Sequence, residues 1–294
     1  MQRSYRAVLS HLIDYAGLFP PAGLGMPAAV ANYAAYRSGA DRWALARFVV
    51  PASRLGELVA AKAALPVSTA AGDEWPLSVL LGPDPSASWG EVERLGSRLL
   101  PVGVRVCTVE GRVSTPAEVR AIRAVIPPGY ELYLECPIGQ GLPALLDAIG
   151  AAGARAKIRT GGTRADEFPA TEAVTDFIAG CAAARLAFKA TAGLHHPVRG
   201  SYPLTYAEGS PCATMFGYLN LVLAATLLWT GGNAEQARAA LTAGDHGRLV
   251  ATDDALSWGD VSCSTGAIER TRREFMTAIG SCSFTDPLSE IGAT

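Results

Sequence analysis

The chain has 294 residues, of which 49% are hydrophobic and 18% charged, and its formal net charge is −2. This composition indicates a globular protein that is large enough to bury a substantial core. The nearly neutral charge provides no electrostatic argument for nucleic acid or an anionic membrane as a partner, so neither is expected. The first residues do not resemble a signal peptide, and the longest apolar run, residues 215–229, is short for a membrane span of roughly 20 residues. A cytoplasmic location is therefore expected.

Short apolar runs bounded by glycine or proline alternate with alanine-rich segments of helical spacing along the whole chain. The predicted strands cover residues 11–15, 46–50, 77–81, 104–109, 131–135, 154–159, 186–190 and 248–252. The predicted helices between them cover residues 27–38, 53–64, 89–99, 116–125, 142–152 and 170–184. The segment before the last predicted strand is longer than one crossover needs and predicts two helices, at 212–230 and 233–243.

Eight strands alternating with helices predict an α/β fold, a (β/α)8 TIM barrel that forms a single domain over residues 1–294. The long segment at 197–245 adds an extra helix between strands 7 and 8. A doubly wound sheet is the alternative, but no GxGxxG motif follows the first predicted strand. The six cysteines show no CxxC spacing, which favours reduced thiols over disulfides or a zinc site.

Lysine is rare in this chain. Of 25 basic residues only three are lysines, Lys62, Lys157 and Lys189, and the last two stand in apolar runs that end in glycine. A lysine can lose its proton when it is desolvated and then act as an amine nucleophile, whereas arginine effectively cannot. Two lysines on neighbouring barrel strands would repel each other as ammonium ions, so at least one is expected to have a lowered pKa. That is one route to a Schiff-base lysine.

Catalytic side chains in such a barrel come from the carboxyl ends of the strands and the loops that follow them. Alternate residues of a strand face the same way, so Lys157 shares a face with Arg159, and Lys189 shares one with Thr191. The polar residues predicted at these strand ends are Asp14, Glu135, Lys157, Arg159, Thr160, Lys189, Thr191, His195, His196 and, after the last predicted strand, Asp253.

Two segments resemble the deoxyribose-phosphate aldolases, which are class I, Schiff-base-forming aldolases. Lys-Ile-Arg-Thr-Gly (157–161) resembles the Lys-Thr-Ser-Thr-Gly strand that carries the Schiff-base lysine of that family. Phe-Lys-Ala-Thr-Ala-Gly-Leu (188–194) resembles its next strand, Val-Lys-Ala-Ser-Gly-Gly-Ile, which carries a second lysine. Shorter likenesses near residues 12–18, 48–53 and 132–135 extend the match over about residues 10 to 195.

The resemblance implies roles for individual residues. Lys157 would attack a substrate carbonyl to form an iminium, and Lys189 would lower the pKa of Lys157 and shuttle protons. Glu135 and Asp14 would supply a general acid or base. Arg159 would bind a substrate carboxylate through two hydrogen bonds. The remaining candidates for substrate binding are Thr160, Thr191, His195, His196 and Asp253.

The chain departs from the family's pattern at two strands. The family's fourth strand presents an aspartate that relays protons, whereas residues 104–109 contain no acid before Glu110. The family's eighth strand ends in a Gly-Thr-Ser-Ser phosphate cradle, whereas the predicted strand here ends in Ala251-Thr-Asp-Asp, whose two carboxylates would repel a phosphate. The sequence therefore predicts a divergent lyase or aldolase of the class I superfamily. Its expected partner is a small carbonyl substrate that can carry a carboxylate but no phosphate.

Three alternatives remain open. The lysines can form a structural ion-pair network with Asp14 and Glu135. Asp14, Glu135 and His195 could instead hold a divalent metal in a metal-dependent lyase or isomerase, although no HExxH motif supports this and no cofactor is predicted. A barrel without chemistry could also serve as a binding or scaffolding subunit. The apolar helix at 212–230 can pack against its own barrel or a second copy, so a homo-oligomer is a further option.

Overall fold

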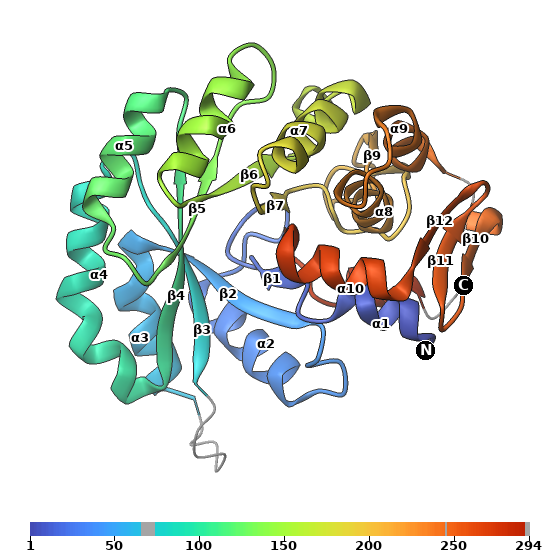
Figure 1. Ribbon diagram of the computed structural model, residues 1–294. Helices are drawn as coiled ribbons and strands as arrows, with labels where there is room; N and C mark the ends of the chain where they lie inside the picture. The colour runs from blue at the N-terminus through green and yellow to red at the C-terminus, as the bar shows by residue number, and fades with distance from the viewer. Residues whose placement is uncertain (66–73, 245, 292–294) are drawn as a thin grey trace.

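The computed structural model describes residues 1–65, 74–244 and 246–291. Eight parallel strands form a closed barrel with helices around it (Figure 1), so the predicted TIM barrel is confirmed. The barrel strands, in chain order, are β1 (Ile13–Tyr15), β2 (Leu45–Pro51), β3 (Trp75–Leu80), β4 (Val104–Arg112), β5 (Glu131–Glu135), β6 (Arg155–Arg159), β7 (Phe188–Thr191) and β13 (Met276–Ser281).

The helices predicted between the first seven strands are all present, with ends that differ by a few residues. The helix α5 illustrates why they form, because Thr115 and Glu118 make a reciprocal capping box and Pro116 occupies the first helical position. The α-helices are α1 (Arg3–Leu9), α2 (Met26–Ser38), α3 (Leu55–Ala63), α4 (Pro85–Leu99), α5 (Pro116–Val125), α6 (Leu142–Ala151), α7 (Thr171–Ala183), α8 (Tyr218–Trp229), α9 (Ala234–Thr242), α10 (Thr265–Glu274) and α11 (Asp286–Ser289). Short 3-10 helices are η1 (Ala52–Arg54), η2 (Leu100–Val102), η3 (Ala165–Glu167) and η4 (His246–Arg248).

The prediction of the eighth barrel strand at 248–252 was wrong. Leu249–Ala251 form β10, which pairs antiparallel with β11 (Ala255–Trp258) and, through it, with β12 (Val261–Ser264) in a small sheet outside the barrel (Figure 1). The barrel is closed by β13, which pairs with both β7 and β1. Val250 is 55% exposed whereas Ile279 of β13 is fully buried, as a barrel strand requires. A short apolar run in the sequence does not distinguish these two settings.

A bulge in β4 determines which of its side chains enter the barrel. In the pairing of β3 with β4, Leu77 lies opposite Val106 but Ser78 lies opposite Thr108, so Cys107 is an extra residue in β4. An extra residue reverses the alternation of side chains beyond it. Arg105 and Cys107 face the amino end of the barrel, and Glu110 is turned into the interior.

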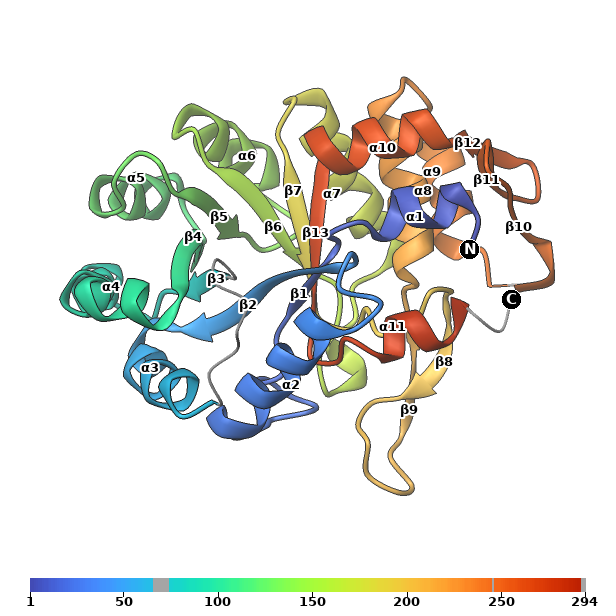
Figure 2. The same cartoon turned by 90° about the horizontal axis from the view of Figure 1, so that it is seen from below.

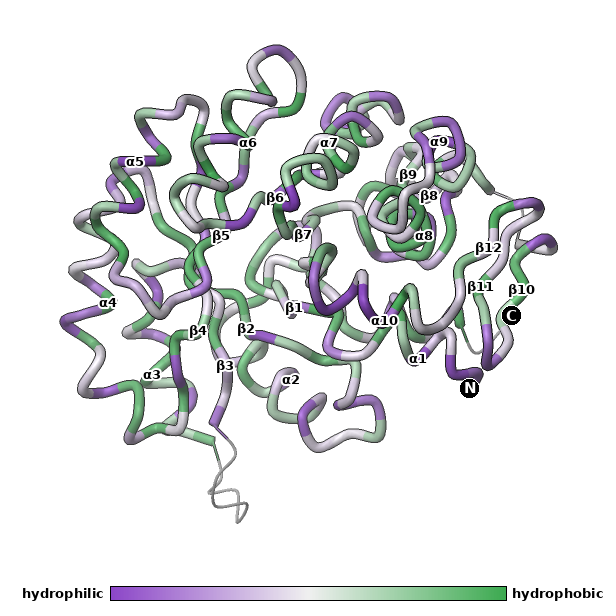
Figure 3. Tube along the Cα trace, viewed as in Figure 1, coloured by the Kyte–Doolittle hydropathy of each residue, from purple (hydrophilic) through white to green (hydrophobic). Residues whose placement is uncertain are grey.

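The long segment between β7 and β13 begins with a hairpin, β8 (Gly200–Pro203) and β9 (Cys212–Met215), which projects beside α11 (Figure 2). The helix α8 that follows is strongly hydrophobic (Figure 3), and its residues 218–226 are buried within the chain. Of the two options for α8, packing against its own chain is the one that the structure shows. Within the described ranges, no helix has the length and apolar character needed to cross a bilayer.

Asn220 is a polar residue in the first turn of α8, and it is fully buried. Its amide nitrogen donates to the carbonyl oxygens of Ala240 and Ala243, at 2.7 and 2.8 Å. Its side-chain oxygen accepts from the backbone N–H of Arg199 at 2.8 Å. Asn220 therefore joins α8 to the end of α9 and to the segment before the hairpin.

Replacing Asn220 by alanine removes three hydrogen bonds to backbone groups, one of them buried and two partly buried, and a buried group left without its partner costs about 1–3 kcal/mol. Asn220→Ala is expected to lower the free energy of unfolding by about 2–4 kcal/mol, measured by urea denaturation. Thr230→Ala, which removes an exposed hydroxyl at the end of the same helix, is the control and should change it by less than about 0.5 kcal/mol. Equal effects of the two substitutions would contradict this role for Asn220.

Candidate active site

A cavity of about 320 Å³ opens at the carboxyl ends of the barrel strands. One wall is apolar and comes from the segment after β1 and from β2 and β3; it includes Phe19, Val49 and Leu80. The opposite wall comes from β4, β6 and β7 and the loops after them, and its charged residues are Glu110, Arg112, Lys157, Arg159, Glu167 and Lys189. The cavity can therefore hold a small molecule that has an apolar part and a polar part.

A row of charges of alternating sign crosses the barrel beneath this cavity. Lys189 Nζ donates to Asp14 Oδ2 and, at 2.7 Å, to Glu110 Oε1. Lys157 Nζ lies 2.7 Å from Glu110 Oε2 and 2.9 Å from Glu135 Oε2. The order is thus Asp14, Lys189, Glu110, Lys157, Glu135, and the first four residues are at most 4% exposed. We refer to these five residues as the charge row.

Glu110 lies at the centre of the charge row. It is not among the site residues that the sequence predicts. Each of its two carboxylate oxygens contacts one lysine, and Oε1 also accepts a hydrogen bond of 2.5 Å from Ser78 Oγ. The acid that the fourth strand was expected to lack is therefore present two positions beyond Thr108, within a strand that runs to Arg112. In a regular strand, Glu110 would face the opposite way from Arg105 and point out of the barrel. The extra residue at Cys107 reverses this alternation, so that Glu110 points into the interior.

The sequence predicts a lowered pKa for at least one of the paired lysines, and the structure gives the opposite for Lys189. Burial alone would lower the pKa of Lys189, but the charges of Asp14 and Glu110 outweigh it and raise the pKa above the ordinary value of lysine. Burial would raise the pKa of Glu110 and Glu135, but the lysines hold both below the ordinary range of glutamate. Lys189 is therefore an ammonium ion at neutral pH, and both glutamates are ionised.

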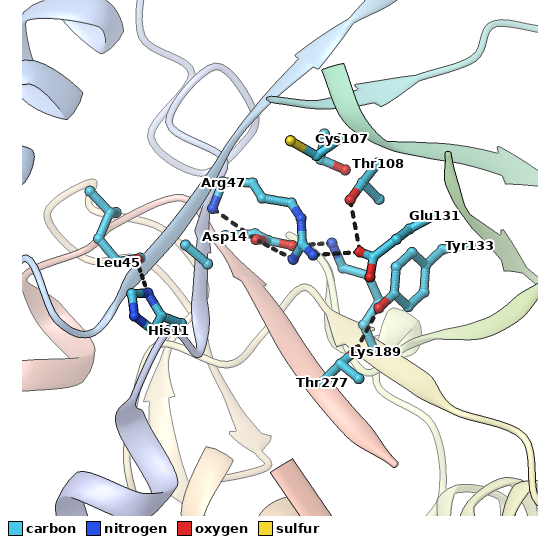
Figure 4. A network of polar contacts seen from close by, with 12 residues as sticks. His11, Asp14, Leu45, Arg47, Cys107, Thr108, Glu131, Tyr133, Lys189 and Thr277 are labelled. Atoms are coloured by element: carbon cyan, nitrogen blue, oxygen red, sulfur yellow. Dashed lines mark hydrogen bonds and ion pairs between the residues drawn. The ribbon is translucent and has the colours of Figure 1, made fainter. Parts of the chain in front are cut away.

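Arginines complete the charge row at each end. At the cavity, Glu135 Oε1 lies 3.3 Å from the Nε atoms of both Arg159 and Arg112. At the other end, the backbone N–H of Arg47 donates to Asp14 Oδ1 at 3.0 Å, and its side chain lies between Asp14 and Glu131 (Figure 4). Arg159 is among the residues that the sequence predicts at the strand ends, whereas nothing in the local pattern around Arg47 or Arg112 marks either of them.

The predicted substrate-binding residues separate into two groups. Thr191 and His195 line the cavity together with Arg159. Thr160 is buried below it, where its hydroxyl donates to the carbonyl oxygen of Ala192 at 2.7 Å and ties the end of β6 to that of β7. Its role in this position is structural.

Two further candidates lie away from the cavity. His196 Nδ1 is 2.6 Å from Glu290, and its ring stacks on Tyr202 at a centroid distance of 3.4 Å. Asp253 accepts a hydrogen bond of 2.8 Å from the backbone N–H of Arg3, outside the barrel. The placement of Asp253 at the mouth was wrong because it depended on the incorrect eighth strand.

His195 is the histidine of the cavity. Its Nδ1 lies 3.3 Å from Ser281 Oγ and 3.9 Å from Cys282 Sγ. Burial lowers the pKa of His195 to about 4, so its ring is neutral at neutral pH. The alternative of a metal site at Asp14, Glu135 and His195 finds no support, since the described part of the chain holds no group of three or more His, Cys, Asp or Glu side chains placed to bind an ion.

Comparisons with known proteins provide no family for this chain: no protein-family model and no curated protein matches it.

The lowered pKa values of Glu110 and Glu135 predict how stability depends on pH. As the pH falls below about 4.5, the ordinary value for glutamate, the unfolded chain takes up protons that the folded protein resists. The stabilisation is present above that pH and is lost below it, by about 2 kcal/mol for Glu110 between pH 6 and pH 3. Urea unfolding of the wild type at several pH values measures this loss.

Glu110→Gln removes that titrating group and should flatten the dependence, although it lowers stability at pH 7. Glu235→Gln, which changes an exposed glutamate of α9, should keep the wild-type dependence. A wild-type protein equally stable at pH 6 and pH 3 would contradict the charge row as described.

Proposed function

We propose that the protein is a Schiff-base-forming lyase or aldolase that acts on a small carbonyl compound. The observation that carries this proposal is that two buried lysines on neighbouring strands contact one glutamate, Glu110, beside a cavity of about 320 Å³. The resemblance of the two lysine strands to those of deoxyribose-phosphate aldolases supports the same chemistry. Active sites of TIM-barrel enzymes lie at this end of the strands.

Lys157 is the proposed nucleophile. Lys189 is bound by Asp14 and Glu110 and has a raised pKa, so it remains a cation. Lys157 can pass its proton to Glu110 or Glu135, both within 2.9 Å of its nitrogen. Its neutral amine then adds to the substrate carbonyl carbon while the carbonyl oxygen takes up a proton, and loss of water from this carbinolamine gives an iminium. The iminium accepts the electron pair of the C–C bond that breaks.

Glu110 is the proposed proton carrier of this reaction. Its Oε2 lies 2.7 Å from Lys157 Nζ and can receive a proton from that nitrogen and return it, while Lys189 Nζ stays bound to Oε1 at 2.7 Å. The cation of Lys189 stabilises the Glu110 carboxylate and makes it a weak base at rest. This differs from the expectation that Lys189 acts on Lys157 directly, since the glutamate separates the two nitrogens.

The substrate is proposed to carry an anionic group, a carboxylate in the first instance, held by Arg159 and Arg112. Both guanidinium groups line the cavity, and they share one carboxylate, Glu135, so they retain donors for a ligand. The exclusion of phosphate depended on Asp253 and Asp254 lying at the mouth. The last barrel strand is instead β13, which leads into Gly280-Ser-Cys-Ser. Asp253 and Asp254 therefore give no electrostatic reason to exclude a phosphate from the cavity.

Reductive trapping tests the Schiff base directly. Incubation with a panel of small aldehydes and keto acids plus borohydride should produce a covalent adduct at Lys157, found by intact-protein mass spectrometry and peptide mapping. Lys157→Met should abolish the adduct. Lys62→Met is the matched control and should retain it, since Lys62 lies on α3 with its nitrogen 4.4 Å from the centre of the Trp75 ring.

An adduct at Lys189 alone would reverse the assigned roles of the two lysines. A folded wild-type protein that gives no adduct with any carbonyl of the panel would refute the Schiff-base proposal. Function preserved after substitution of both Lys157 and Lys189 would point to a non-catalytic barrel.

The arginine pair predicts a preference for carboxylated substrates. Arg159→Gln is expected to raise KM for a trapped keto acid by about 10- to 100-fold, because a charge-assisted hydrogen bond contributes about 1.5–3 kcal/mol. KM for a neutral aldehyde of similar size should change little with the same variant. Steady-state kinetics with both substrates measures the ratio, and an equal loss for both would rule out carboxylate recognition by Arg159.

A further inference from the structure

The opposite end of the barrel carries a second depression, of about 1140 Å³, where the strands begin. The charged residues of its lining are Arg37, Arg42, Arg47, Arg105, Arg155, Arg272, Arg273, Glu74 and Glu131. An adjoining hollow of about 470 Å³ shares Arg272 and Arg273 with it and adds Arg3, Arg6 and Glu269. Nine of the 22 arginines of the chain thus surround this end, which we call the amino-end depression, in a protein whose net charge is −2.

The carboxylates of the amino-end depression do not balance its arginines. Arg47 Nη2 and Arg155 Nη1 both bind Glu131, at 2.5 and 2.7 Å, so two guanidinium groups share one glutamate. Glu74 is already paired with Arg105 at 2.6 Å. The lining therefore holds seven arginines against two glutamates, and both glutamates are engaged. Two of the seven arginines also have a carboxylate partner outside the lining: Arg47 lies 3.5 Å from Asp14, and Arg273 lies 2.7 Å from Glu274.

Arg272 is the clearest case of an unbalanced charge. Its side chain is buried, and its nitrogens donate to backbone carbonyl oxygens, among them that of Val8 at 2.8 Å and that of Met276. Within the described residues no carboxylate lies at ion-pair distance from it. Burial lowers the pKa of Arg272 to about 10, which leaves it protonated at neutral pH. A buried cation without a counter-ion is costly, and a bound anion would offset that cost.

The arginines approach the depression from different sides. Arg42 lies in the turn before β2, Arg105 and Arg155 stand at the starts of β4 and β6, and Arg273 lies in the last turn of α10. Arg42 is exposed and has no ion pair within the described parts of the chain. Guanidinium groups bind phosphoryl and carboxylate oxygens through pairs of hydrogen bonds, and several around one concave site suit closely spaced negative charges.

We propose that the amino-end depression is a binding site for a small anion with two or more closely spaced negative charges, supplied by phosphoryl groups or by carboxylates. The ligand would bind among Arg42, Arg105, Arg155 and Arg273 and supply the negative charge that Glu74 and Glu131 do not. This site is separate from the cavity at the carboxyl ends and does not depend on the function proposed for it.

Isothermal titration calorimetry of the whole protein with sodium pyrophosphate, and separately with citrate, tests the proposal at low ionic strength. Wild-type protein should bind at least one of the two probes at one site. Arg155→Gln and Arg42→Gln should each weaken that binding by about tenfold or more. Arg155→Gln also loses contacts to Glu131 and Tyr133 and can disturb the fold. Arg42→Gln changes an exposed side chain, so it tests the site without that disturbance.

Two variants act as controls. Arg94→Gln removes an exposed arginine that, like Arg105, pairs with one glutamate but lies on α4 and lines neither cavity. Arg159→Gln changes the cavity at the carboxyl ends. Arg94→Gln should bind the probes as the wild type does, and Arg159→Gln should keep the binding that Arg155→Gln and Arg42→Gln lose. Tighter binding of pyrophosphate would assign the phosphoryl source, and tighter binding of citrate the carboxylate source. Absence of binding to both probes, or a loss confined to Arg159→Gln, would overturn the proposal.

Discussion

The interior of this barrel depends on charge neutralisation between neighbouring strands. TIM barrels are ordinarily filled by layers of branched apolar side chains, whereas here Asp14, Glu110, Lys157 and Lys189 occupy the interior with little exposure to solvent. A single buried charge is strongly destabilising, and only its partners make it tolerable. Each lysine has a carboxylate on either side, and arginines cover the two terminal carboxylates. These buried charges are therefore tolerated only when all of their partners are in place.

This constraint also determines what the cavity can do. Asp14 and Glu110 raise the pKa of Lys189, so this lysine stays charged and can organise charge without reacting. Lys157 differs because one of its partners, Glu135, is shared with Arg159 and Arg112 beside the cavity. A ligand that engages those arginines changes the surroundings of Glu135 and, through it, those of Lys157. In the function that we propose, the Glu135 carboxylate would thus link substrate binding to the activation of the Lys157 amine.

The sequence predicted the barrel because alternating apolar runs and alanine-rich helices persist over the first seven strands. It also predicted the two lysines and two of their three acidic partners, since these residues stand at the ends of recognisable strands. It did not predict that Glu110 lies in the barrel interior. The extra residue at Cys107 reverses the direction of the side chains that follow it in β4, and the spacing of apolar residues in the sequence does not reveal such a bulge. It failed at Asp253 because β10 and β13 are both short apolar runs, and only their pairing partners distinguish them. The arginines Arg47 and Arg112 could be found only once distant strands had been brought together.

The contact between Lys189 and Asp14 joins residues 175 positions apart in the chain. Contacts of such long range are reached late, because the entropy of closing the intervening loop must be overcome before they form. Until β1 and β7 both lie beside β13, Lys189 lacks one of the two carboxylates that make its burial tolerable. Closure of the barrel and assembly of the charge row are therefore one cooperative event. A chain that lacks β1 would lose Asp14, and with it one of the two carboxylates that the burial of Lys189 requires.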